Sequence, residues 1–168
     1  MMMSKRDVRD FYRPAPWTGE ITADLTDIQA IVKRGMDLAP TYQRGSVWSA
    51  KQREDFMGHL LQGGEVMPLV VQRVPDSGQS EMVDGKQRTE AILAWLEGEV
   101  GARMDDGTLL FRHEVEGPLQ RITFKIKYVN MPWDDRKRFY VRFNSSGTPH
   151  TVAQLEAALK ATQKWELQ

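Results

Sequence analysis

The fold that we expect is determined by the stretch Glu81-Met82-Val83-Asp84-Gly85-Lys86-Gln87-Arg88-Thr89-Glu90-Ala91-Ile92-Leu93-Ala94-Trp95. Its first residues form a short extended run that leads into Gly85. The apolar residues that follow, among them Ala91, Ile92 and Trp95, recur at the spacing of one helix face. The stretch therefore predicts a strand, a tight turn and a helix, in that order.

The turn of this stretch has the chemistry of an anion site. Gly85 can adopt a backbone conformation that is closed to other residues, and the helix start presents unpaired N–H groups at the positive end of its dipole. Lys86 and Arg88 add two cationic side chains, while Asp84 can hold a ribose hydroxyl, a metal-bound water or one of these cations. The turn is therefore predicted to hold a phosphate.

Length and composition limit the classes of protein to consider. With 168 residues, of which 40% are hydrophobic, the chain can form one domain with a single core. The 23 basic and 23 acidic residues cancel, so no positive field of the whole molecule would hold DNA, and any nucleic-acid contact must be local. The absence of cysteine excludes disulfides, cysteine nucleophiles and thiolate metal sites.

The sequence gives no indication of a membrane protein. It contains no apolar run of about 18 residues, and its N-terminus lacks the apolar centre of a signal peptide. We therefore expect a soluble, cytoplasmic protein without a membrane partner.

The chain is predicted to form one domain, residues 21–168, behind a flexible N-terminal arm, residues 1–20. The arm mixes charges with prolines, and its aromatic residues suit docking on the domain or on a partner, or stacking on exposed bases. Capping signals and helical spacing predict helices after Thr22 or Asp24, after Ser49, from Lys86, after Pro132 and after Thr151. Strands are predicted at residues 36–39, 67–74 and 122–129 and before Asp84, with a hairpin at Asp106-Gly107 interpreted as a surface insertion.

Two loops carry further side chains that suit a ligand. Residues 40–48 combine Gln43 and Arg44 with two aromatic residues. On composition this loop has two interpretations: Arg44 pairs with a carboxylate while the aromatic rings fill the core, or the loop is one wall of a ligand site. The loop at residues 143–150 offers Asn144 and several hydroxyl groups.

Three separated stretches together resemble a known family. They read Tyr42-Gln43-Arg44-Gly45 with Val47-Trp48, then Val83-Asp84-Gly85-Lys86-Gln87-Arg88-Thr89, then Phe143-Asn144 with Gly147-Thr148-Pro149 and Gln154-Leu155. In order and intervals they resemble the successive motifs of the N-terminal domain of GmrSD-type type IV restriction enzymes, which belongs to the ParB and sulfiredoxin-like superfamily. The resemblance covers residues 21–159.

The resemblance implies an α+β fold of the ParB and sulfiredoxin-like kind, a small sheet flanked by helices. It further implies binding and hydrolysis of a nucleoside triphosphate in DNA processing, restriction or defence, where the nucleotide governs a separate nuclease. Carried over by position, the implied catalytic residues are Asp84, Arg88 and Arg44, with Asp84 also a candidate ligand of Mg²⁺. The implied nucleotide-binding residues are Gln43, Arg44, Gly85, Lys86, Gln87, Arg88, Thr89 and Asn144.

The chain departs from the family pattern in ways that leave its substrate preference open. Lys86 replaces the commoner Gln and adds charge near the phosphates, while Thr89 replaces the commoner Leu and adds a hydroxyl. Restriction-type members usually continue into a nuclease domain with a His-containing metal motif, for which this chain has no counterpart. Its three histidines lie far apart and are interpreted as surface or loop residues, and it has neither a P-loop motif nor the cysteine of a sulfiredoxin-type reductase.

The chemistry that these residues can perform is phosphoryl transfer, in which positioning and electrostatic stabilisation do most of the catalysis. Arg44 and Arg88 would hold the phosphates, and Asp84 would hold Mg²⁺ or orient water. Binding without hydrolysis stays open. Two other classes also stay open. The first is a DNA-binding or nuclease module, suggested by the Arg-rich motif loops, by Lys125 and Lys127, and by the basic helix from Arg136 to Arg142. The second is a non-catalytic domain that docks a protein partner through its N-terminal arm.

Overall fold

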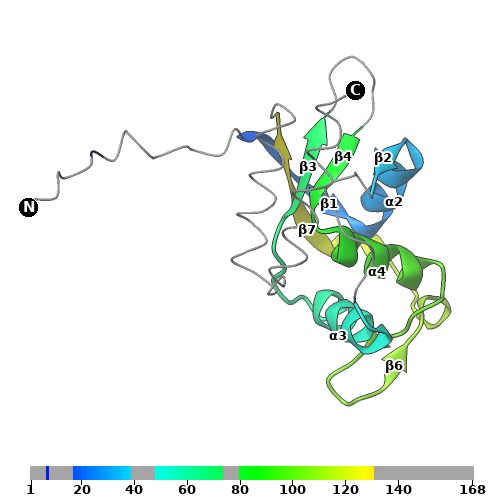
Figure 1. Cartoon of the computed structure of the whole chain (residues 1–168). Coiled ribbons are helices and arrows are strands. Elements are labelled where there is room, and N and C mark those ends of the chain that lie inside the picture. Colours follow the sequence, from blue (N-terminus) through cyan, green and yellow to red (C-terminus); the bar gives the residue numbers. More distant parts are fainter. Residues whose placement is uncertain (1–6, 8–16, 39–47, 74–79, 131–168) are drawn as a thin grey trace, which may run out of the picture.

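The computed structural model of the chain describes residue 7 and residues 17–38, 48–73 and 80–130. These residues form a five-stranded mixed sheet, a two-stranded hairpin and three α-helices (Figure 1). The strands are β1 (Trp17–Asp24), β2 (Met36–Asp37), β3 (Leu69–Arg73), β4 (Ser80–Asp84), β5 (Ala102–Arg103), β6 (Leu109–Leu110) and β7 (Thr123–Val129). The helices are α2 (Leu25–Lys33), α3 (Ala50–Leu61) and α4 (Lys86–Leu96), with 3-10 turns η1 (Arg112–Glu114) and η2 (Leu119–Arg121). The predicted α+β class is confirmed.

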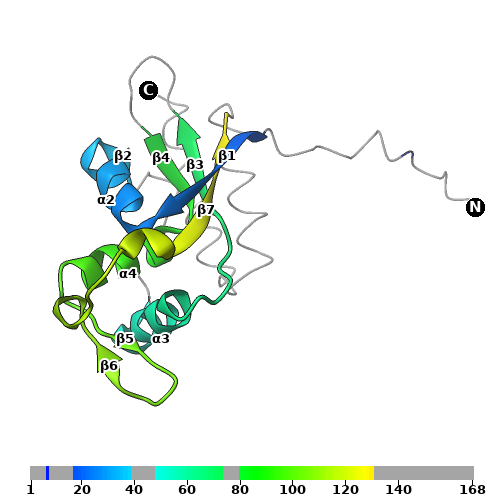
Figure 2. The same ribbon diagram turned by 180° about the vertical axis from the view of Figure 1, so that it is seen from behind.

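The large sheet places the end of β4 in its interior. The strand order is β1-β7-β3-β4-β2, so β4 has a neighbour on each side. β3 and β4 form an antiparallel hairpin, β4 pairs in parallel with β2, and β7 lies between β1 and β3 (Figure 2). Because α4 follows β4 after a single residue, the turn at Gly85 is supported by paired strands.

Successive side chains of a strand point to opposite faces of the sheet, and the buried apolar residues accordingly form two separate clusters. Leu69, Met82 and Ile126 belong to the main core, which also contains residues of α2 and α4. Trp95 of α4 is fully buried there, and its indole N–H donates to the Leu110 carbonyl at 3.0 Å. A second small cluster, Val70, Val83 and Val129, comes from the intervening strand positions and therefore lies on the opposite face of the sheet.

The β5–β6 hairpin packs against α3 through β5, while its tip at residues 105–109 is exposed, in agreement with the surface hairpin that the sequence predicted. Ala102 is fully buried, and β5 lies so close to α3 that a Cβ atom on Gly58 would be 1.7 Å from the Arg103 carbonyl oxygen. Arg103 also forms ion pairs with Glu54 and Asp55 of α3. Glycine at position 58 therefore permits the contact between helix and hairpin, below α4 in Figure 1.

The structure moves the boundary between the predicted arm and the domain. β1 begins at Trp17, four residues inside the segment expected to be a flexible arm that ends at residue 20. The strand is specified by its distant partner β7, for example by the ion pair of Glu20 with Lys125 at 2.6 Å, and local periodicity does not reveal it. Residues 1–6 and 8–16, and the helices predicted after Pro132 and Thr151, lie outside the described residues.

Reciprocal hydrogen bonds begin α2. The sequence left Thr22 or Asp24 as its cap, and the structure has Asp24 there. The Asp24 carboxylate accepts the backbone N–H groups of Thr26 at 2.7 Å and Asp27 at 3.0 Å, while Asp27 accepts the N–H of Asp24 at 2.9 Å. Ser49 and Gln52 form the same arrangement at α3.

Replacing Asp24 by alanine is expected to lower the free energy of unfolding by about 1 kcal/mol, because two N–H groups of the first turn lose their acceptor. Asp24→Asn should retain most of this stability at neutral pH, because the amide oxygen can accept the same bonds. Urea denaturation of the three proteins measures both effects.

The pH dependence of this cap has a defined sign. A hydrogen bond from the Thr26 hydroxyl, with further bonds from backbone N–H groups, lowers the pKa of Asp24 below its ordinary value of 3.8. The stability from the ionised cap is therefore present above that value and is lost as the pH falls through the lower folded pKa. Wild type should lose more stability than Asp24→Asn between about pH 5 and pH 2; equal losses would contradict the assignment.

Candidate functional site

The predicted strand, turn and helix are present, and an irregularity in the sheet lies just before the turn. Val70 pairs with Asp84 but Val71 pairs with Met82, so β4 has one extra residue, Val83, between the two pairs. Such a bulge bends its strand and changes the direction of the side chains that follow it. The bulge therefore helps to set the position of Asp84 at the end of β4.

Gly85 is required at the turn for two independent reasons. Its φ of +107° lies in the region that side-chain-bearing residues rarely adopt. An added Cβ atom would also lie 2.3 Å from Leu69 Cδ2 and 3.4 Å from Arg88 Nη2. Because Leu69 is itself buried in the core, it has little room to turn away.

Arg88 connects three parts of the chain. Its Nη2 donates to the Asp84 carboxylate at 2.6 Å, and its Nη1 donates to the carbonyl oxygens of Met67 and, at 3.3 Å, of Pro68. The side chains of Arg88 and Asp84 are only 14% and 17% exposed. Burial lowers the pKa of Arg88 from its ordinary value and the nearby Asp84 charge opposes this shift, so the guanidinium stays protonated.

The neighbouring polar residues of α4 are also largely buried. Lys86, the first residue of the helix, is 8% exposed and its Nζ lies 3.9 Å from Glu90 Oε1. A cation at this end of a helix is opposed by the dipole. Thr89 is fully buried, and within the described residues its hydroxyl has no hydrogen-bond partner. A negative charge near this helix start would interact favourably both with Lys86 and with the positive end of the helix dipole.

Gln87 connects the turn with the first of the ligand-type loops. The backbone N–H of Trp48 donates to Gln87 Oε1 at 3.1 Å, and the Trp48 ring packs against Phe56 with centroids 5.4 Å apart. Trp48 directly follows the residues 42–47 that include Gln43 and Arg44. The hydrogen bond therefore brings the end of that loop to the first turn of α4.

The described residues do not fit a protein-held Mg²⁺ site. Asp84 would be the ligand, but its carboxylate already forms an ion pair with Arg88. Within the described parts of the chain, no group of three or more acidic or histidine side chains is placed to hold a metal ion. The expected role of Asp84 as a ligand of Mg²⁺ stays a prediction, and no chemical step is derived through the metal.

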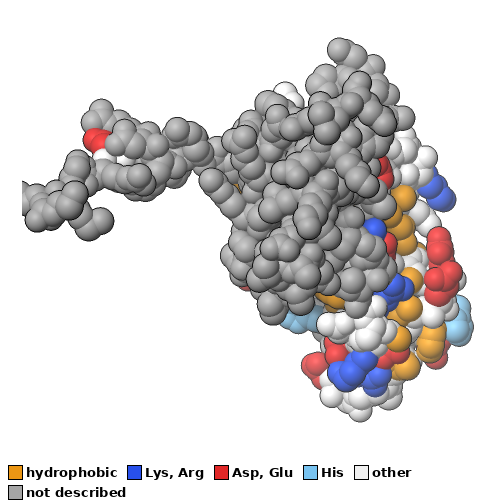
Figure 3. Space-filling view, in the orientation of Figure 1, with side chains coloured by type: hydrophobic (Ala, Val, Ile, Leu, Met, Phe, Trp, Pro, Cys, Tyr) orange, Lys and Arg blue, Asp and Glu red, His pale blue; other side chains and the backbone are white. Residues whose placement is uncertain are grey.

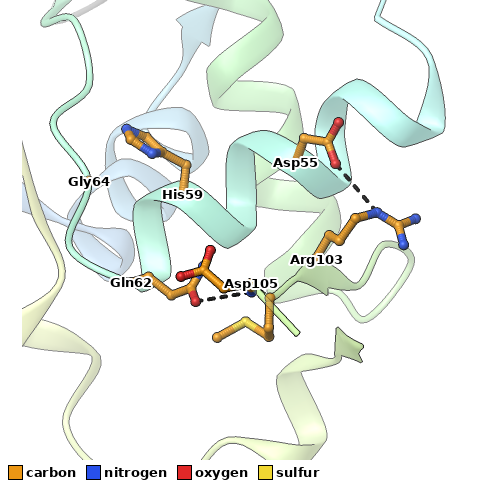
Figure 4. A pocket seen from close by; sticks show the side chains of 7 residues that line it. Asp55, His59, Gln62, Gly64, Arg103 and Asp105 are labelled. Carbon is orange, nitrogen blue, oxygen red and sulfur yellow. Dashed lines mark hydrogen bonds and ion pairs between the residues drawn. The ribbon is translucent and has the colours of Figure 1, made fainter. Parts of the chain in front are cut away.

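Described residues line two cavities, and both cavities lie away from the turn at Gly85. One of about 430 Å³ lies between α3 and the β5–β6 hairpin and is lined by Asp55, His59, Gln62, Gly64, Arg103, Met104 and Asp105 (Figure 4). Several of its polar groups bond to each other, as in the pairs Asp55 with Arg103 and Gln62 with Asp105. The other, of about 490 Å³, is lined by residues 60–64 and 121–123. Neither includes a predicted site residue.

Residues 25–148 match the family described as the GmrSD restriction endonuclease, N-terminal domain. The match extends over most of the chain and includes the stretches around Arg44, Arg88 and Asn144. The chain belongs to this GmrSD N-terminal domain family. The resemblance that the three motifs indicated is thereby confirmed.

The other comparisons add little to this assignment. A solved structure of the C-terminally truncated chromosome-partitioning protein ParB from Caulobacter crescentus, complexed with CTP-γ-S, aligns with 16% identity and a TM-score of 0.46. The alignment covers 88% of this chain and 65% of the ParB chain. At this level of similarity, the ParB structure supports no conclusion about this chain. No curated protein matches. In the described part of this GmrSD N-terminal domain, no helix is both long and apolar enough to cross a membrane.

In this member of the GmrSD N-terminal domain family, the structure brings together six of the predicted site residues in one strand, turn and helix: Asp84, Gly85, Lys86, Gln87, Arg88 and Thr89. Gln43, Arg44 and Asn144 lie outside the described residues. Sequence reasoning missed the carbonyl groups of Met67 and Pro68 and the N–H of Trp48 as parts of this arrangement, because backbone groups leave no signal in a residue pattern.

Replacing Gly85 by alanine is expected to lower the free energy of unfolding by about 2–5 kcal/mol, from backbone strain together with the contact with Leu69. The matched control is Gly35→Ala, since Gly35 has φ +108° but nothing within 4 Å of an added Cβ atom. The control should lose only the backbone part, about 1–2 kcal/mol. Urea denaturation measures the free energy of unfolding of both variants. Equal losses would show that the Leu69 side chain moves aside at no cost and that the contact contributes nothing.

Proposed function

We propose that this GmrSD N-terminal domain binds a nucleoside triphosphate at the turn of residues 84–88 and acts in DNA restriction or defence. Membership of the family supports the restriction context. The proposal further includes that the domain hydrolyses the nucleotide and that the nucleotide controls a separate nuclease.

The observation that carries the proposal is the conformation of the start of α4. Gly85 caps the helix from a left-handed conformation and forms no side-chain cap, whereas α2 and α3 both begin with reciprocal side-chain caps. A helix start of this kind presents backbone N–H groups and the positive dipole end to an anion. Because the turn is fixed by Leu69 on one side and Arg88 on the other, its geometry is set before any ligand arrives.

The charges around the turn support a phosphate in particular. Lys86 is held at the helix start with limited exposure, where an anion would offset the unfavourable interaction with the dipole. The hydrogen bond from Trp48 to Gln87 brings the chain that follows Arg44 to the same turn. In this proposal Gln43 and Arg44 form an opposing wall and Asn144 contributes from a third segment.

The described residues favour nucleotide binding over the DNA-binding alternative. Lys125 and Lys127, the lysines that suggested a DNA surface, lie 2.6 Å and 3.8 Å from the carboxylate of Glu20. On the face shown in Figure 3, basic and acidic side chains of the described residues are interspersed. An arrangement of mixed charges attracts a DNA backbone less than a single-sign surface does.

The proposal predicts that at least one nucleoside triphosphate raises the melting temperature of the wild type by several degrees at about 100-fold excess over its Kd. Lys86→Ala should weaken binding about tenfold or more, because a charge-assisted contact is lost. Lys51→Ala is a matched control: Lys51 also lies in the first turn of a helix and pairs at i,i+4 with a carboxylate, but on α3. Its binding should be unchanged.

Thermal-shift and calorimetric measurements with the four nucleotides, with and without Mg²⁺, test this prediction. Phosphate release measured on the same samples separates hydrolysis from binding alone. If no nucleotide stabilises the wild type, the proposal is wrong. Salt-sensitive binding of a short DNA duplex in the absence of nucleotide binding would favour the DNA-binding alternative.

A further inference from the structure

Arg88 is the residue of the turn motif that a sequence comparison most readily assigns to a phosphate, but its guanidinium is already engaged. We infer that Arg88 is a positioning residue, which fixes the shape of the turn from behind and does not touch the phosphate. The inference deepens the proposed function and rests on it for the identity of the ligand.

The acceptors of Arg88 come from separate parts of the chain. Met67 and Pro68 lie just before β3, Asp84 ends β4, and Arg88 itself lies in the first turn of α4. A planar guanidinium with donors on both outer nitrogens can serve carbonyl groups on one side and a carboxylate on the other. One side chain thereby connects both strands of the β3–β4 hairpin to the helix.

Moving this guanidinium to a ligand would be unfavourable. Arg88 and Asp84 are both largely buried, so a departing guanidinium would remove a cation from beside a buried carboxylate. Breaking one side of a buried ion pair is strongly destabilising, because the remaining charge is uncompensated. A phosphate would have to replace these interactions before it gained anything from Arg88.

The guanidinium also lies against the turn itself. A Cβ atom on Gly85 would be only 3.4 Å from Arg88 Nη2, so the group passes beside the backbone that presents the helix start. The bulge at Val83 places Asp84 where it can accept from this group. Arg88 therefore acts on the ligand through Asp84 and Gly85, and direct phosphate contacts fall to the backbone of the turn and to Lys86.

Two substitutions at one position separate a positioning role from a ligand contact. Arg88→Lys keeps the positive charge but loses the planar fork, while Arg88→Ala loses both. Both variants should lower the melting temperature by about 10 °C. At about 10 °C, where folding is checked by circular dichroism, both should bind inorganic tripolyphosphate about tenfold more weakly than wild type.

The salt dependence of tripolyphosphate binding distinguishes a direct phosphate contact from a positioning role, which a change in stability cannot do. A residue that touches phosphate contributes to the slope of log affinity against log salt, whereas a positioning residue does not. The slope should be unchanged in Arg88→Lys, which keeps the charge, and reduced in Lys86→Ala. Wild-type affinity in Arg88→Lys with a reduced slope in Arg88→Ala would overturn the inference in favour of a direct contact. Unchanged affinity in both folded variants would overturn it in favour of a structural role only.

Nitrogen-15 spectra of the Arg88 side chain test the arrangement in the free protein. Two separate, slowly exchanging Nη resonances are expected, and they should persist at saturating tripolyphosphate. A single averaged resonance in the free protein, or loss of the separate resonances on binding, would overturn the inference. If the wild type binds neither tripolyphosphate nor any nucleotide, the proposed function and the positioning role fail together, while the spectra still show whether the guanidinium is fixed.

Discussion

The ion pair between Arg88 and Asp84 is the interaction on which the candidate site depends. It joins the end of an inner strand to the start of the following helix, and the same guanidinium reaches the chain before β3. Without this link, the left-handed turn at Gly85 would depend on the contact with Leu69 and on the pairing of β4 with β3. The conformation of the turn is thus determined by its surroundings, which is how an unfavourable local geometry persists in a folded protein.

The start of α4 lacks the favourable capping and charge pattern that begins the other two described helices. α2 and α3 begin with reciprocal caps, and their sequences indicate these boundaries correctly. α4 begins with a buried lysine at the positive end of its dipole and a buried threonine whose hydroxyl lacks a partner within the described residues. Where a sequence conflicts with local rules while the rest of the fold obeys them, a functional constraint is the usual reason.

Sequence patterns predicted the elements whose signals are local. Ser49 before α3, Gly85 before α4 and the alternation of β7 were sufficient because each depends on residues close together in the chain. The strand β1 was missed because it is largely exposed and is specified by pairing with β7. The bulge at Val83 and the carbonyl partners of Arg88 were not predictable either, since they arise from register and backbone positions that only tertiary structure sets.

The position of β7 in the sheet has a consequence for how the protein is made. Of the described strands, β7 is the last in the chain, yet it lies between β1, the first, and β3. During synthesis the ribosome releases β1, β3 and β4 well before it releases residues 123–129, so the hairpin of β3 and β4 can form early while β1 waits for its partner. The sheet therefore closes in one late step of high contact order, and until then both β1 and the outer edge of β3 are open to pairing with other chains.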